Sequence, residues 1–421
     1  MVVLLRTPGA LRRFLAASLQ SSIGNAIGYI ALILLAYDMT HSAWAVSAVL
    51  LADSGPAILL APLFGSLADR YSRRTLVVAA DLLRFGAFVA LAFAGSLTAV
   101  IVLALIAGLG GALYQPAAKS ALPGLAGERA DEAMGALVAS WSAAGMIGPG
   151  LGVALLAVVS PAELLLVNAA TFLVSAIVLG RLRLDRPARA AVAPADESSV
   201  AHGVRAGVRA ARGISGLSVI VCTGGAATLA FSLMNLAEPL LARAELKTGA
   251  AGFALLVCVF GIGSTIGALC GRAEGWTMLI TLTGGGLALA ASAVVPSVEL
   301  AAATFLATGV FAGAYLSSEH QLVARLAPEE VLGRVFGLKD ALDATALCAA
   351  FVVGAVIVSH SDARVAFAVS GVAALVVAVV ATVMLLRAGV VTRPRMNDIA
   401  STARRRSGLV GRSAGVGGAG N

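Results

Sequence analysis

The chain has 421 residues, of which 59% are hydrophobic and 12% are charged, and its formal net charge is +8. Soluble domains carry about 25% charged residues, and no water-soluble fold of this length can bury so much apolar surface. The composition therefore predicts an all-α membrane protein with many spans and excludes the soluble classes of protein.

Apolar segments long enough to cross a bilayer follow one another along the whole chain. We expect twelve of them, near residues 11–37, 43–67, 75–95, 98–118, 133–159, 162–181, 214–242, 250–271, 276–295, 299–324, 335–359 and 364–387. They predict an N-terminal six-helix bundle (1–181), a cytoplasmic linker (182–213), a C-terminal six-helix bundle (214–388) and a disordered basic tail (389–421).

The basic residues predict the orientation in the membrane. With the N-terminus inside, every second loop is cytoplasmic. Of the 30 lysines and arginines, only Arg243, Lys247 and Arg364 then lie outside, and Arg84 lies within a span. This asymmetry follows the positive-inside rule, places both termini in the cytoplasm and accounts for the positive charge without a nucleic-acid partner.

Sequence motifs of enzymes and metal sites are missing from the chain. It contains no HExxH, no phosphate-binding GxxxxGK[ST] and no paired cysteine and histidine ligands. Its four cysteines all fall in apolar segments, where a thiol acts as a small packing residue. We therefore expect no enzymatic activity, no cofactor and no metal, and we exclude an ATP-driven pump as a single chain.

A short hinge joins the second and third apolar segments. It places Gly65, Asp69 and Arg70 before the basic pair Arg73 and Arg74. This pattern resembles the signature between helices 2 and 3 of the major facilitator superfamily of secondary transporters, although Ser72 stands where that family usually has a second glycine. The resemblance implies two pseudo-symmetric six-helix bundles and a conformational latch formed by the hinge residues.

The fifth apolar segment carries a second pattern. Gly135, Gly148, Pro149 and Gly152 have the spacing of the antiporter motif of facilitator exporters, to which the segment is similar. Small residues let helices approach closely, and proline removes a backbone hydrogen bond and kinks the helix. The alternative is that these residues only serve close packing in an alanine-rich helix.

Three further stretches resemble one bacterial efflux branch of that family, which includes macrolide exporters and the enterobactin exporter. They are Tyr114–Ala117, Asn168–Phe172 and Pro328–Val335. Asn25 stands where that branch often has an aspartate, and Ala104 stands where many proton-coupled drug antiporters have an arginine. The resemblance implies a central cavity, for which Asn25 and Gln115 are candidate polar residues.

Charged residues within the spans are candidates for function because each is costly to insert into a bilayer. Asp53 and Arg84 lie at similar predicted depths in neighbouring spans, and Asp81 precedes Arg84 by one helical turn. Arg84 is therefore expected to pair with either Asp53 or Asp81. The alternative role for Asp53 is that of a proton site.

The best candidates for coupling to an ion are Glu238 and Glu319, with Asp53 in reserve. In the resembled fold they lie on helices that line the central cavity, and the alternative is that each reaches the lipid headgroups. Asp340 and Asp343 are expected at the start of the eleventh span, where the positive end of the helix stabilises them.

These features together predict a secondary active exporter of a small amphipathic molecule, such as a drug, antibiotic, natural product or siderophore, working by alternating access with proton antiport. An importer, a lysophospholipid flippase and a non-transporting receptor or scaffold are the alternatives. The expected partners are the substrate, protons or another cation, and the lipid bilayer. We expect a monomer that crosses the bacterial cytoplasmic membrane many times.

The hinge provides the first prediction. Asp69→Asn should impair transport while leaving membrane insertion intact, because the carboxylate of Asp69 gains from Arg73 and from the N-terminus of the eleventh span only when the cytoplasmic side is closed. Transport and membrane expression of the variant are the measurements. Full transport at wild-type expression would contradict a latch.

Overall fold

The computed structural model describes residues 9–60, 71–156, 158–184 and 211–391, together with Phe64, Leu67, Val208 and Arg209. The first half contains α2 (Gly9–Thr40), α3 (Ala43–Leu59), α5 (Arg73–Ala92), α6 (Leu97–Ala126), α7 (Ala130–Leu156) and α8 (Pro161–Gly180). The second half contains α10 (Leu217–Ser232), α11 (Met234–Leu240), α12 (Gly249–Cys270), α13 (Gly275–Ser292), α14 (Val298–Leu326), α15 (Glu329–His360) and α16 (Ala363–Arg387).

Each expected segment overlaps one of these helices, except that the segment 214–242 contains both α10 and α11. Helix α3 ends at Leu59, and residues 61–63, 65 and 66 of the expected segment 43–67 lie outside the described residues. Within the described residues, nine helical segments are long and apolar enough to cross a membrane, and three shorter helices are apolar as well. Most of the expected linker and nearly all of the expected tail lie outside the described residues.

Serine residues define the starts of several helices. The hydroxyl groups of Ser96, Ser160 and Ser297 accept a hydrogen bond from the backbone N–H three residues later, at the start of α6, α8 and α14. At Ser160 the carboxylate of Glu163 also accepts from the backbone N–H of Ser160, at 2.7 Å, which completes a capping box. These caps end short loops that turn the chain back into the bundle.

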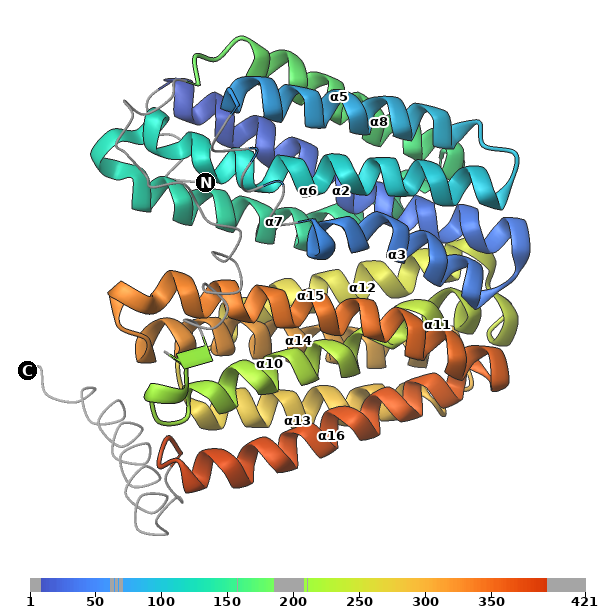
Figure 1. Cartoon of the computed structure of the whole chain (residues 1–421). Helices are drawn as coiled ribbons and strands as arrows, with labels where there is room; N and C mark the ends of the chain where they lie inside the picture. Colours follow the sequence, from blue (N-terminus) through green and yellow to red (C-terminus); the bar gives the residue numbers. More distant parts are fainter. Residues whose placement is uncertain are drawn as a thin grey trace, which may run out of the picture.

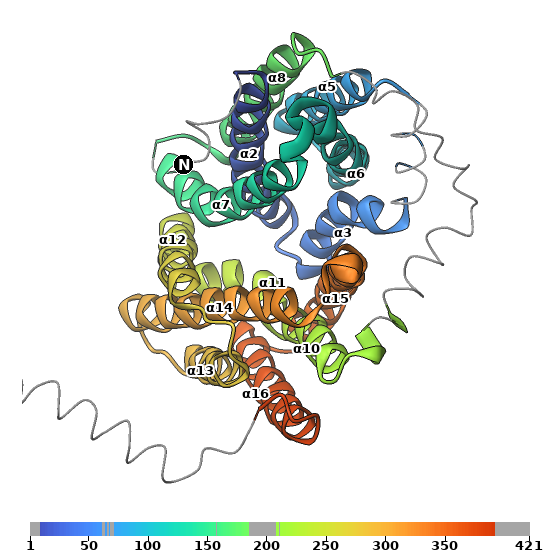
Figure 2. The ribbon, with the colours of Figure 1, turned by 90° about the vertical axis from the view of Figure 1, so that its left-hand side faces the viewer.

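The two halves form two bundles that lie side by side (Figure 1). The view along the helices shows α7 facing α12 and α3 facing α15 across the interface between the halves (Figure 2), and both pairs are in contact. Within the first half, α6 packs against α3 and against α5. The start of α2 and the end of α16 lie at the same end of the molecule, which we call the inner end because the charge pattern predicts it to be cytoplasmic.

Glycines allow very close packing between α12 and α14. A Cβ atom on Gly309 would lie 2.2 Å from the carbonyl oxygen of Phe260, and one on Gly267 would lie 1.9 Å from that of Val310. Two GxxxG pairs form this contact, Gly263 and Gly267 on α12 and Gly309 and Gly313 on α14. Glycine removes the side chain between the two backbones, so the helices approach more closely than any other residue would permit.

The first half repeats this contact between α3 and α6. A Cβ atom on Gly108 of α6 would lie 2.2 Å from the carbonyl oxygen of Asp53 on α3, the same separation as at Gly309 in the second half. The corresponding helices of the two halves are therefore packed in the same way, as expected for two related bundles.

The buried apolar residues form three clusters, and their distribution defines the conformation. One cluster joins both halves at the outer end and includes Leu34, Leu50, Phe88, Phe305, Phe351 and Phe367. At the inner end the first half has a core of its own, with Phe14, Val77 and Leu122, and so does the second half, with Ile220, Val323 and Leu385. Among the described residues, the two halves thus share one core at the outer end and have separate cores at the inner end.

A polar contact also crosses the interface at the outer end. The hydroxyl of Ser47 on α3 donates to the backbone carbonyl of Phe351 on α15 at 2.8 Å, and the bond is buried. This hydrogen bond lies within the shared core, so it adds a directional contact between the two halves to contacts that are otherwise apolar.

Replacing the glycine at the α12–α14 contact gives the second prediction. Gly309→Ala should lower the stability of the fold by about 1–3 kcal/mol, because the new methyl group overlaps the backbone of α12. Gly337→Ala is the matched control, since a Cβ atom there meets no atom within 4 Å. Thermal unfolding of the two purified variants in detergent is the measurement, and equal melting temperatures would contradict the role given to Gly309.

Candidate functional site

The hinge of the predicted latch is only partly described. Gly65, Asp69 and Arg70 lie outside the described residues, while Arg73 and Arg74 form the first turn of α5. The latch therefore stays a prediction from the sequence.

The small residues of the antiporter pattern lie on α7 and differ in what they contact. A Cβ atom on Gly148 would lie 2.5 Å from the Cβ of Ala26, and one on Gly152 would lie 3.3 Å from Ile30 Cδ1, both on α2. Gly135 has no neighbouring atom within 4 Å of such a Cβ, and the side chain of Pro149 is outside the described part. Gly148 and Gly152 thus bring α7 close to α2.

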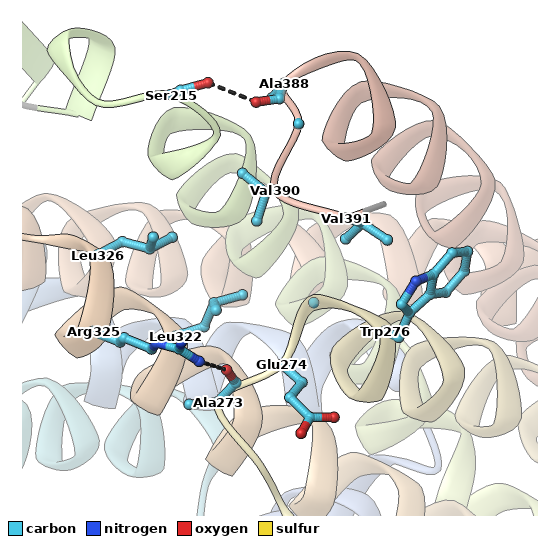
Figure 3. Close-up of a pocket in the computed structure, with 12 residues that line it drawn as sticks. Ser215, Ala273, Glu274, Trp276, Leu322, Arg325, Leu326, Ala388, Val390 and Val391 are labelled. Atoms are coloured by element: carbon cyan, nitrogen blue, oxygen red, sulfur yellow. Dashed lines mark hydrogen bonds between the residues drawn. The ribbon is translucent and has the colours of Figure 1, made fainter. Parts of the chain in front are cut away.

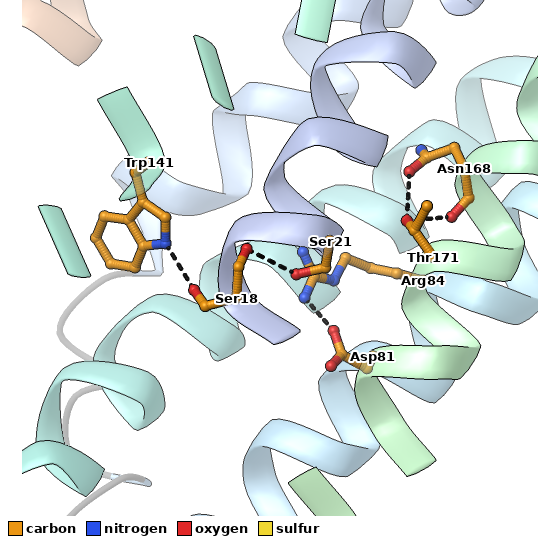
Figure 4. Close-up of polar contacts among 7 residues, drawn as sticks. All are labelled: Ser18, Ser21, Asp81, Arg84, Trp141, Asn168 and Thr171. Atoms are coloured by element: carbon orange, nitrogen blue, oxygen red, sulfur yellow. Dashed lines mark hydrogen bonds and ion pairs between the residues drawn. The ribbon is translucent and has the colours of Figure 1, made fainter. Parts of the chain in front are cut away.

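Arg84 is buried on α5 and forms an ion pair with Asp81 one turn earlier (Figure 4). Its guanidinium carbon lies 4.5 Å from the ring centroid of Tyr114 on α6 and 4.2 Å from that of Phe172 on α8. The charge is therefore balanced by one carboxylate and covered by two aromatic faces, an arrangement that stabilises a buried cation. Gly110 provides the space, because a Cβ atom there would lie 2.7 Å from Arg84 Cγ.

Asp53 is the alternative partner that the structure does not use, since no salt bridge to it is present among the described residues. Helices α3 and α5 are neighbours in the sequence, but α6 packs against both of them. The expectation that adjacent spans could pair Asp53 with Arg84 overlooked this intervening helix. Sequence order does not give spatial order in a helical bundle.

Polar side chains on α2 surround the Arg84 pair. The indole N–H of Trp141 on α7 donates to the hydroxyl of Ser18 at 3.1 Å, and the hydroxyl of Ser21 donates to the Ser18 carbonyl at 3.2 Å (Figure 4). The two residues expected in the cavity, Asn25 on α2 and Gln115 on α6, are both exposed. Their place in a cavity stays a prediction from the sequence.

The seventh span changes from α-helical to π-helical geometry just after a buried carboxylate. Helix α10 ends at Ser232, α11 follows, and a π-helical turn spans Leu241–Glu245. Pro239 within α11 lacks a backbone donor, and π-helical turns occur frequently at functional sites. The adjacent Glu238 is only 7% exposed, and no hydrogen bond or ion pair to it is present among the described residues.

Glu238 lies on a helix that contacts the first half. Helix α11, which carries Glu238, contacts α3, which carries Asp53, and α3 also contacts α2, which carries Tyr29. Two carboxylates and a phenol therefore lie on three helices that pack together where the two halves meet.

The second half contains a buried ionic network that the sequence analysis missed. Lys339 on α15 lies 2.5 Å from Asp343 Oδ2 and 3.4 Å from Glu319 Oε2 on α14. The hydroxyl of Thr228 on α10 donates to Asp343 Oδ1 at 3.2 Å. The signal for Lys339 was available, because it is one of only three lysines in the chain and the only one four residues before an acid in an apolar segment.

The expectation that the N-terminal end of a helix stabilises Asp343 was wrong. Helix α15 begins at Glu329, so Asp343 lies well inside the helix and not in its first turn. The positive end of the helix acts over the first turn only, so the ammonium group of Lys339 balances this carboxylate instead. Asp340, which was expected beside it, is exposed.

The loop between α12 and α13 is held by the inner end of α14. Ser318 accepts from the backbone N–H of Arg272 at 3.0 Å, Gln321 donates to the Gly271 carbonyl at 3.2 Å, and Arg325 donates to the Ala273 carbonyl at 3.1 Å. These hydrogen bonds go to the backbone, so this hinge belongs rigidly to the second half.

A cavity of about 590 Å³ opens beside that loop. Figure 3 shows Arg325 bonded to Ala273 on one side of it and the hydroxyl of Ser215 donating to the Ala388 carbonyl, at 2.8 Å, on the other. All of its lining residues belong to the second half. It is therefore separate from the interface between the halves.

Comparison with known proteins identifies the family. Residues 13–276 match the Major Facilitator Superfamily. The chain therefore belongs to the Major Facilitator Superfamily and is a multi-pass membrane transporter, not an enzyme.

Two relatives match along most of their length. The uncharacterised MFS-type transporter YfiS of Bacillus subtilis is 24% identical and covers 87% of this chain and 91% of its own. The multidrug efflux pump Tap of Mycolicibacterium fortuitum is 27% identical and covers 79% of this chain and 85% of its own.

Solved structures show the same fold. A bacterial homologue of the human lysosomal transporter Spinster, in an inward-facing and unoccupied conformation, has a TM-score of 0.65 at 15% identity and covers 92% of this chain and 100% of its own. A POT family transporter in complex with a thioalcohol-conjugated peptide has a TM-score of 0.66 at 12% identity, covering 91% and 97%. The expected fold class, an all-α membrane protein of the major facilitator type, is thereby confirmed.

The Arg84 pair gives the third prediction. Arg84→Ala should reduce the amount of folded protein strongly, because it leaves the carboxylate of Asp81 buried without its partner, and breaking a buried pair costs about 3–5 kcal/mol. Arg387→Ala, at the last residue of α16, is the control for loss of an arginine. Size-exclusion profiles of fluorescently tagged variants measure the folded fraction. Equal profiles for the two variants would show that the pair is dispensable.

Proposed function

We propose that this protein is a secondary active exporter of small amphipathic molecules that works by alternating access and exchanges its substrate for protons. The observation that carries this proposal is the division of the core, in which the two halves share one cluster at the outer end and keep separate clusters at the inner end. With the predicted orientation, such a conformation takes up substrate from the cytoplasm or the inner leaflet.

Alternating access follows from the same arrangement. The outer closure consists of apolar side chains and the hydrogen bond from Ser47 to Phe351, so it can separate without breaking a buried ion pair. Each half carries its own ionic network, Asp81 with Arg84 in the first and Glu319 with Lys339 and Asp343 in the second. Both halves can therefore rock as rigid bodies with their charges balanced inside.

Export is supported by the antiporter pattern on α7 and by the multidrug efflux pump among the relatives. The substrate class follows from the lining expected for such a route, where apolar side chains predominate and a few polar groups, such as Asn25 and Gln115, provide orientation. We place the protein in the bacterial cytoplasmic membrane as a monomer.

Proton coupling is assigned to the buried carboxylates. Glu238 is buried in the seventh span with no hydrogen bond or ion pair to it among the described residues, and Asp53 lies on α3, which contacts α11. A carrier carboxyl must bind a proton in one conformation and release it in the other. A buried acid between two halves that separate during transport meets this requirement, because each conformation exposes it to a different side.

The fourth prediction tests this assignment. Glu238→Gln should abolish uphill efflux of a lipophilic dye from proteoliposomes under an imposed pH gradient, while preserving dye binding and passive exchange. Glu319→Gln and Asp53→Asn are measured in parallel because they are the other candidate carriers. Glu299→Gln is the matched control, since that glutamate lies exposed in the first turn of α14.

Two outcomes would overturn the proposal. If all three variants pump uphill like the wild type, the protons do not travel on these carboxylates. If cells with the protein accumulate more dye than cells without it, and an uncoupler abolishes the difference, the protein is an importer.

A further inference from the structure

The ionic network of the second half contains more acids than bases. Two carboxylates, of Glu319 and Asp343, surround one ammonium group, of Lys339. The corresponding pair of the first half, Asp81 and Arg84, is balanced one to one. If both acids of the second half were ionised, the network would hold a net negative charge inside an apolar bundle, which is strongly unfavourable.

The geometry shows which acid is bound to the lysine. Lys339 lies 2.5 Å from Asp343 but 3.4 Å from Glu319. Asp343 also accepts a hydrogen bond from Thr228, and its side chain is 24% exposed, so its carboxylate has two partners and is partly open to solvent. Glu319 is 1% exposed, and its second oxygen, Oε1, has no hydrogen-bond partner.

The space around Glu319 leaves its carboxyl little freedom. A Cβ atom on Gly224 of α10 would lie 2.0 Å from Glu319 Oε1, so this oxygen occupies the gap that the glycine leaves. Among the described residues, the other titratable or charged groups near the network are Tyr315 and His320 on α14 and Asp340 on α15. Tyr315 is a neutral phenol, His320 is half-buried, and Asp340 is exposed, so none of them supplies the missing positive charge within the buried site.

We propose that Glu319 binds one proton in this conformation and that Lys339 is the counter-charge that replaces the proton when it leaves. In the protonated state Lys339 pairs with Asp343, and Glu319 is neutral against Gly224. When the proton leaves Glu319, the ammonium group is shared between two carboxylates, one on α14 and one on α15. The proton therefore decides whether the contact between Lys339 of α15 and Glu319 of α14 involves a neutral carboxyl group or is an ion pair.

This inference deepens the proposed function, because it makes Glu319 a proton site whose state is linked to helix contacts, and its meaning for transport rests on that function. The inference itself does not need transport to be tested. It predicts the number of protonated carboxyl groups in the network, which equals the number of acids minus the one lysine.

Difference infrared spectroscopy of the full chain in lipid vesicles at neutral pH gives the fifth prediction. The carbonyl stretch of one protonated carboxyl group should be present in the wild type and lost in Glu319→Gln. It should also be lost in Asp343→Asn, because Lys339 is then free to pair with an ionised Glu319. Lys339→Met should show a gain of one protonated carboxyl, since neither acid keeps a counter-charge.

A matched pair of glycine variants assigns the band to this site. Gly224→Ala should shift the frequency of the band, because the new methyl group displaces the oxygen that it would overlap. Gly225→Ala should leave the band unchanged, since a Cβ atom there makes only an ordinary contact of 3.4 Å with Leu342.

Two results would overturn the inference. A wild-type spectrum identical to that of Glu319→Gln would show that Glu319 is ionised, and a band that persists in Asp343→Asn would show that Asp343 does not determine its protonation. Both results are independent of dye transport. A failed efflux assay with the expected spectra would instead refute the proposed function and leave the proton site in place.

Discussion

The constraint on which the rest of this structure depends is that a charge buried among apolar helices must be balanced within reach of its own side chain. Moving an unpaired ion from water into such an interior costs several kcal/mol even after relaxation. The chain meets this constraint separately in each half, with Arg84 and Asp81 in the first and Lys339 with two acids in the second. Because no buried ion pair crosses between the halves among the described residues, the halves can move apart without stranding a charge.

Glycine determines how closely the helices of each half pack. Where α12 meets α14, and where α3 meets α6, the backbones touch at glycines that leave no space for a methyl group. Lipid chains are as apolar as leucine, so close packing and not water exclusion provides most of the attraction between membrane helices. The same property appears at functional positions, since Gly110 makes space for Arg84 and Gly224 for the carboxyl of Glu319.

The distribution of the cores relates this packing to transport. Each half has its own apolar core at the inner end. When the two halves lie apart at this end, each of these cores therefore stays buried within its own half. At the outer end the shared core and the Ser47–Phe351 hydrogen bond hold the halves together. Helix α11 of the seventh span also belongs to this region, since its buried residues are part of the shared cluster.

The sequence by itself determined the class of the fold, the positions of the helical segments and the presence of unusual charges at Asp53, Asp81, Arg84, Glu238 and Glu319. It could do so because span length, hydropathy and the cost of a buried charge are local properties that each segment carries on its own. Only the tertiary structure decided which charges meet. Helix α6 packs against both α3 and α5, and Arg84 pairs with Asp81 rather than with Asp53. Lys339 of α15 lies next to Glu319 of the neighbouring helix α14. The tertiary structure also decided at which end the described residues of the two halves share one core, because contacts between helices that are distant in the sequence are not a property of any single segment.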